Sequence, residues 1–284
     1  MEPSEKTFLS RHPAVKKMKA AGEELGLPKA DIRLSLGLRA LMGVMHGRGN
    51  VDISGEDNLI EAAERAKEKN RGLVVITSHE SGLDVPTASY LASLVGKTSI
   101  GIASTNGDWI KEGVGGFNPE PIQYVLTGRE NFIPVPYTWM DRKNKKPVPF
   151  TEDDYKEAVE RVKDGEILVM AGFSDHESVE HRKIGSAAAH IALEAGVEIL
   201  PISISSDKAE DFSGGPSAAV LKDHNLKITI GDSRDNWLST IQHSYTEASP
   251  ETKKAMRNKL KNILAKGNVF KRIVGKGNRH LPKE

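Results

Sequence analysis

The sequence predicts an α/β fold in which a mostly parallel central sheet is flanked by helices, with an N-terminal helical appendage. Short, continuous runs of β-branched and apolar residues, typical of strands buried on both faces, alternate with longer amphipathic or Ala-rich segments. The 284-residue chain also lacks cysteine and carries a net charge of +1. Disulfide frameworks and thiolate metal sites are therefore excluded, and a reducing compartment is favoured.

Each element from residue 50 onward has a local signal. The helix expected at 152–163 begins after the capping residue Thr151, and Asp164-Gly165 forms the turn between this helix and the next strand. Gly196 ends the Ala-rich helix expected at 184–195. The expected strands are 51–53, 73–77, 98–103, 132–135, 166–171, 197–204 and 226–230, and the expected helices are 58–69, 85–94, 152–163 and 184–195.

Three parts of the chain are expected: an N-terminal helical appendage (1–49), an α/β domain (50–250) and a basic C-terminal helix and tail (251–284). In the first part an apolar helical stripe could pack on the main domain or contact a membrane. This stripe consists of Leu34, Leu38, Leu41, Met42 and Met45.

The C-terminal part is strongly basic. From Lys253 to Glu284 there are 11 Lys and Arg residues against one acidic residue, which leaves 29 basic and 38 acidic residues before it. Met256, Leu260, Ile263 and Leu264 have helical spacing, so this segment either docks on the domain or meets an anionic surface or acidic protein. We expect no nucleic-acid partner, because basic and aromatic residues do not interleave.

The segment after the second expected strand contains the chemistry-bearing residues. His79 follows Thr77-Ser78 at the end of an apolar run, and Asp84 stands five residues later, just before an expected helix. A His oriented by a carboxylate is a general base. The alternative is structural: a surface His, and an Asp that only caps the helix.

Several segments in the same order resemble the glycerolipid acyltransferase family, whose members acylate lysophosphatidate or glycerol 3-phosphate. His79-Glu80-Ser81-Gly82-Leu83-Asp84 resembles the first family motif, H-x-S-x-x-D. The other matching segments are 51–59, 132–135, 164–170, 185–192, 197–202 and 227–231. The resemblance spans residues 51 to 231 and implies acyl transfer from a thioester donor, acyl-CoA or acyl carrier protein, to a glycerolipid hydroxyl.

In that reaction His79 is the implied base and Asp84 its orienting carboxylate. Gly82 and the amides at the start of the helix near Val85 are expected to face the oxyanion. The resemblance implies no cofactor besides the donor substrate, and we expect no metal.

The third family motif departs from its usual F-P-E-G-T-R-S. Here the register reads Ala171-Gly172-Phe173-Ser174-Asp175-His176, without the Glu and Arg that bind the acceptor, and the Arg of the second motif is missing too. We therefore expect a rearranged acceptor site. Its candidate substrate-binding residues are Arg142, Lys143, Ser174, His176, Arg182 and Lys183.

Three alternatives stay open. Gly172-Phe173-Ser174 could place Ser174 as a nucleophile after a strand. A metal site is a second alternative, although no HExxH or HxH spacing supports it; its ligands would be His79, Asp84, Asp175, His176, Glu177 and His181. The altered third motif also allows a catalytically divergent lipid- or acyl-carrier-binding protein that keeps the fold.

No apolar run approaches 18 residues, and the first residues have no signal-peptide character. We therefore expect a cytoplasmic protein, with weak peripheral binding to the anionic inner face of the membrane.

Overall fold

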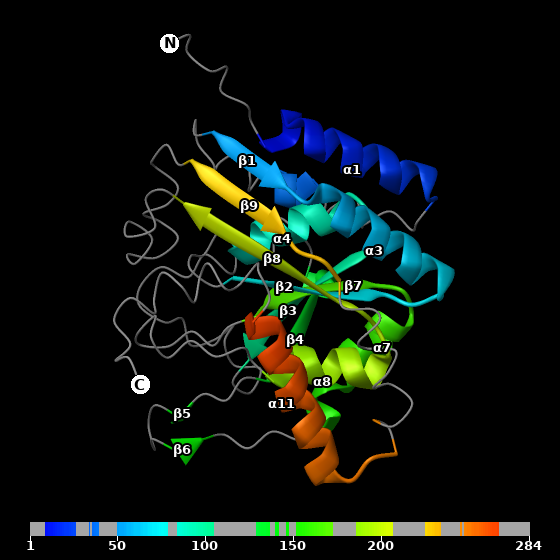
Figure 1. Ribbon diagram of the computed structural model, residues 1–284, viewed down its shortest axis with the longest axis vertical. Helices are drawn as coiled ribbons and strands as arrows, with labels where there is room; N and C mark the ends of the chain where they lie inside the picture. The colour runs from blue at the N-terminus through cyan, green and yellow to red at the C-terminus, as the bar shows by residue number, and fades with distance from the viewer. Residues whose placement is uncertain are drawn as a thin grey trace.

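The computed structural model contains a seven-stranded sheet with helices on both faces (Figure 1). It describes residues 9–26, 34, 36–39, 50–78, 84–104, 129–136, 140–141, 146–147, 152–172, 186–206, 225–233, 245 and 247–266.

Apart from two short strands at 140–141 and 146–147, the strands and helices lie where local sequence signals predict them, with small shifts at their ends. The first turn of the helix expected at 152–163 is a 3-10 helix. The strands are β1 (Val51–Ser54), β2 (Leu73–Thr77), β3 (Thr98–Ser104), β4 (Phe132–Pro136), β5 (Met140–Asp141), β6 (Lys146–Pro147), β7 (Ile167–Ala171), β8 (Ile199–Ser206) and β9 (Leu226–Ile230). The α-helices are α1 (Pro13–Glu24), α3 (Glu56–Glu68), α4 (Asp84–Ser93), α7 (Lys156–Lys163), α8 (Ser186–Ala195) and α11 (Pro250–Lys266). Short 3-10 helices cover Leu9–Arg11, Arg129–Asn131 and Glu152–Tyr155.

The strand order is β1-β9-β8-β2-β7-β3-β4. Neighbouring strands are parallel except β8 and β9, which pair antiparallel. The predicted α/β class with a mostly parallel sheet is therefore confirmed. As a result, the carboxyl ends of β8, β2, β7, β3 and β4 meet at one edge of the sheet, while β1 and β9 run the other way.

Alternate residues of the central strand β2 face two separate cores. Leu73 and Val75 pack in a cluster with α1, α3 and α4, whereas Val74 and Ile76 pack in a second cluster with α7, α8 and α11. This alternation explains why every residue of β2 is apolar until its last position: both faces of the strand are covered by helices. Figure 1 shows the two helical layers on opposite sides of the sheet.

The described N-terminal residues belong to the first core. Val15 and Met18 of α1 are buried there, and so are Leu34 and Leu38. These two leucines are the first members of the apolar stripe, so their side chains are not available to a membrane. Leu41, Met42 and Met45 lie outside the described residues.

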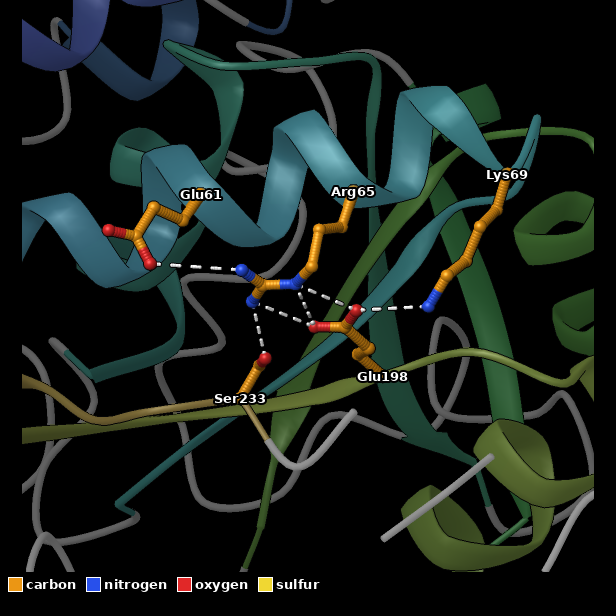
Figure 2. Close-up of polar contacts among 5 residues, drawn as sticks. All are labelled: Glu61, Arg65, Lys69, Glu198 and Ser233. Carbon is orange, nitrogen blue, oxygen red and sulfur yellow. Dashed lines mark hydrogen bonds and ion pairs between the residues drawn. The ribbon is translucent and has the colours of Figure 1, made fainter. Parts of the chain in front are cut away.

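Two buried glutamates stand at the amino ends of the strands on either side of β2. Glu198, just before β8, accepts hydrogen bonds from Arg65 Nε (3.1 Å) and Nη2 (3.1 Å). It also forms an ion pair with Lys69 Nζ (3.4 Å). Arg65 also donates to Ser233 Oγ at 2.6 Å (Figure 2). This cluster ties α3 to the amino end of β8 and to the segment after β9.

Glu166, just before β7, is held in the same way. Lys97 Nζ lies 2.5 Å from Glu166 Oε1, the Ser99 hydroxyl donates to the carboxylate, and Arg161 Nη1 lies 3.6 Å away. Burial alone would raise the pKa of the Glu166 carboxyl, but these hydrogen bonds and positive charges lower it below its ordinary value. Glu166 was expected to open the strand, whereas the strand begins at Ile167 and Glu166 serves as an anchor.

The C-terminal helix α11 docks on the second core. Leu260 and Leu264 are buried, and Met256 packs against the same cluster. The docked interpretation of this apolar stripe is therefore confirmed for the part of the helix that the structure describes.

Polar contacts also hold α11 in place. Lys253 Nζ lies 3.2 Å from Glu152 Oε2, and Arg257 Nη1 donates to the Tyr245 hydroxyl at 3.0 Å. The same hydroxyl lies 3.0 Å from Nδ1 of His190 in α8. Burial lowers the pKa of His190 to about 4, so this imidazole is neutral at pH 7.

One feature of the architecture was not predicted from the sequence. β5 and β6 form a small antiparallel pair, separate from the main sheet, on either side of residues 142–145. The helix expected at 85–94 is α4, which begins one residue earlier, at Asp84. Among the helices of the described part of the chain, none is long and apolar enough to cross a membrane.

Candidate functional site

The predicted catalytic segment and the altered third motif follow adjacent strands. β2 and β7 pair in parallel with Thr77 opposite Ala171, their last residues. Residues 78–83 continue from β2 and residues 172–185 from β7, so the two segments begin side by side at the carboxyl edge of the sheet. Sequence order alone separates these strand ends by more than ninety residues.

The two segments then lead to opposite faces of the sheet. β2 continues into α4, which packs in the first core, and β7 continues into α8, which packs in the second. In open α/β sheets, ligands bind outside the carboxyl ends of strands at such a divergence. The edge formed by β2 and β7 is therefore the candidate site.

Gly172 permits the close approach of these two strand ends. Its amide donates to the carbonyl oxygen of Thr77 at 2.8 Å, and a Cβ at this position would lie 3.2 Å from both that oxygen and Ile76 Cβ. A larger residue would require its neighbours in β2 to shift by a few tenths of an ångström. Close packing against β2 therefore favours glycine at position 172, the first residue after β7.

Asp84 is buried at the start of α4, with 1% of its surface exposed. A carboxylate in the first turn of a helix interacts favourably with the helix dipole and with the amides of that turn. Val85, the second residue of α4, is half-buried. Asp84 was expected to cap the helix from the preceding position, whereas it is the first residue of α4. A place in the first turn is compatible with a catalytic role, because a carboxylate has two oxygens.

Ser78, the residue before His79, fixes the chain at the end of β2. Its hydroxyl donates to the carbonyl oxygen of Ile204 at 3.1 Å and accepts from the amide of Ile204 at 2.9 Å. Its own amide donates to Ile202 O at 3.0 Å. β8 therefore holds the backbone up to the residue that precedes the expected base.

The other predicted site residues lie outside the described residues, so their roles stay predictions. They are His79, Gly82, Arg142, Lys143, Ser174, His176, Arg182 and Lys183. The backbone places the flanks of three groups of them: 79–82 after β2, 174–183 between β7 and α8, and 142–143 between β5 and β6.

Within the described ranges, no three His, Asp or Glu side chains gather in a way that could hold a metal ion. Of the ligands considered from the sequence, only Asp84 belongs to those ranges. Thr77 is not among the site residues predicted from the sequence. Its signal was a hydroxyl at the end of an otherwise apolar strand buried on both faces.

Comparison with known proteins gives a distant structural likeness. No protein-family profile and no curated protein matches the sequence. Among solved structures, the chain is similar to the 1-acyl-sn-glycerophosphate (LPA) acyltransferase PlsC from Thermotoga maritima, with 16% sequence identity and a TM-score of 0.44. The similarity covers 98% of this chain and 87% of that one.

Proposed function

We propose that the protein is an acyltransferase that moves a fatty acyl group from a thioester donor, acyl-CoA or acyl carrier protein, to a hydroxyl of a glycerolipid precursor such as lysophosphatidate or glycerol 3-phosphate. One observation carries the proposal: the H-x-S-x-x-D segment and the segment in the place of the third motif begin at adjacent parallel strand ends, β2 and β7. The collinear order of the other family-like segments supports it.

The proposed reaction needs a base, an acceptor and a place for negative charge. His79 takes the proton of the acceptor hydroxyl, whose oxygen attacks the thioester carbonyl carbon. Asp84 orients the imidazole and stabilises its protonated form. The negative oxygen of the tetrahedral intermediate faces amides at Gly82 and Val85, near the positive end of the α4 dipole.

Collapse of the intermediate breaks the carbon–sulfur bond. His79 then returns its proton to the departing thiolate, so the products are the acylated acceptor and the free thiol. No cofactor takes part, and the protein itself is not acylated.

The acceptor site is proposed to be basic but rearranged. Arg142, Lys143, Arg182 and Lys183 supply cations for an acceptor phosphate in place of the missing Glu and Arg, with Ser174 and His176 as additional polar contacts. Segment 173–185 follows β7, one of the two strands that frame the proposed site, whereas residues 142–145 lie between β5 and β6, outside the main sheet.

The test is an acyl-transfer screen. Purified protein is incubated with acyl-CoA or acyl carrier protein donors and with glycerol 3-phosphate, lysophosphatidate or a non-phosphate alcohol, and the acylated product is measured. The matched variants are His79→Ala, Asp84→Asn and Glu80→Gln, the last being a control within the same segment.

We expect transfer by the wild-type protein and by Glu80→Gln. We also expect a loss of at least about a hundredfold in His79→Ala, because a positioned general base contributes about 10² to 10⁴ in rate. Binding of a lipid or an acyl carrier protein without turnover would favour the catalytically divergent binding protein instead. Activity that survives His79→Ala would remove the proposed mechanism.

A further inference from the structure

The hydroxyl of Thr77 is buried at the candidate site without a protein partner. Thr77 ends β2, after four apolar residues, and none of its surface is exposed. Its Oγ1 forms no hydrogen bond. A buried, unpaired hydroxyl destabilises a fold, and valine, which has nearly the same shape, would avoid this cost.

Loose packing does not explain the unpaired hydroxyl. The carbonyl oxygen of Thr77 accepts from Gly172 at 2.8 Å, and the residue pairs with Ala171 of β7 and Ile202 of β8. The adjacent hydroxyl of Ser78 makes two hydrogen bonds to Ile204. One strand end thus carries two hydroxyls, one fully paired and one not.

Its place in the sheet gives the Thr77 hydroxyl a functional setting. Side chains alternate along a strand, so Thr77 lies on the same face of β2 as Leu73 and Val75, the face that α4 covers. α4 begins with the buried Asp84, and the proposed base His79 is two residues beyond Thr77. The hydroxyl and the carboxylate therefore share one face and are joined by a six-residue connection.

We infer that Thr77 is a positioning residue for the proposed acyl transfer: its hydroxyl donates a hydrogen bond to the Asp84 carboxylate when donor and acceptor are bound. The inference rests on the proposed function. Catalytic hydrogen bonds are often absent or long in the free enzyme and form in the substrate complex. This hydrogen bond orients the carboxylate toward the imidazole. In the free protein the hydroxyl stays unpaired, and this lowers the stability of the fold.

The experiment compares Thr77→Val with Thr77→Ser in the acyl-transfer assay. Ser89→Ala is the matched control, because Ser89 Oγ is the other hydroxyl that is buried and unpaired among the described residues, and it lies inside α4. Thermal unfolding is measured for each variant. Thr77→Val is also made in the Asp84→Asn background.

We expect Thr77→Val to lower kcat about tenfold, the effect of one hydrogen bond, with little change in KM and no loss of thermal stability. Thr77→Ser should keep most of the activity, and Ser89→Ala all of it. In the Asp84→Asn background Thr77→Val should cost less than threefold, since its effect passes through the carboxylate.

Wild-type kcat in Thr77→Val would overturn the inference and leave the proposed function intact. So would a loss of kcat that Thr77→Ser shares and that follows a fall in stability, because this would show a structural role. The same tenfold loss in the Asp84→Asn background would also overturn it. If the wild-type protein transfers no acyl group, the proposed function fails, and the inference fails with it.

Discussion

The buried Glu198 cluster allows a stability prediction that does not depend on function. Glu198→Gln keeps the shape of the side chain but removes the charge shared by Arg65 and Lys69. The pair with Arg65 is charge-assisted, with two contacts of 3.1 Å, and such hydrogen bonds contribute about 1.5–3 kcal/mol.

The exposure of the partners sets the size of the effect. Removing one partner of a fully buried ion pair costs about 3–5 kcal/mol, because the remaining charge has no water. Here the side chains of Arg65 and Lys69 are 32% and 47% exposed, so both cations can regain some hydration. We therefore expect Glu198→Gln to lower the free energy of unfolding by about 2 kcal/mol.

The assay is urea unfolding followed by circular dichroism. The matched control is Glu61→Gln: this carboxylate also contacts Arg65, at 3.7 Å, but its side chain is 60% exposed, and exposed pairs of this spacing contribute about 0.3–0.5 kcal/mol. If the two variants have the same urea midpoint, burial of the Glu198 carboxylate does not determine how much it contributes to the free energy of unfolding. The buried contacts drawn in Figure 2 would then contribute no more to stability than the exposed one.

Three further predictions concern pH, packing and membrane binding. His190 has a pKa of about 4 in the folded protein and about 6.5 when unfolded, so the unfolded chain binds the extra proton first. Stability should therefore fall by up to about 3 kcal/mol as the pH drops from 6.5 to 4, and His190→Gln should reduce this dependence in urea titrations. Leu260→Ala should lower the free energy of unfolding by about 2–4 kcal/mol because it leaves a cavity under α11, whereas the exposed Lys259→Ala should change it by less than about 0.5 kcal/mol. The basic C-terminal part should bind anionic vesicles weakly, with a contribution of about 1 kcal/mol from each cation near the surface. The fraction of protein that sediments with vesicles should therefore fall as the salt concentration rises, and binding that does not change with salt would contradict this.

The sequence alone determined the class of the fold and the identity of most elements. Runs such as Leu73–Thr77 and Ile167–Ala171 are apolar at every position, which already indicates strands covered on both faces. These signals are local, because they depend on residues close together in the chain. For the same reason the sequence alone places Asp84 next to the start of a helix and His79 after a buried strand.

The tertiary structure decided which segments meet. Strand order depends on how the helical connections cross the sheet, and that depends on contacts between residues far apart in the chain. Only the sheet places β7 beside β2, so that the segment after Ala171 begins next to the segment after Thr77. Charge burial is equally non-local: Glu166 and Glu198 look like surface residues until Arg and Lys side chains from other elements surround them. The unpaired hydroxyl of Thr77 is another non-local feature. Whether a buried hydroxyl finds a hydrogen-bond partner depends on all the residues that pack around it.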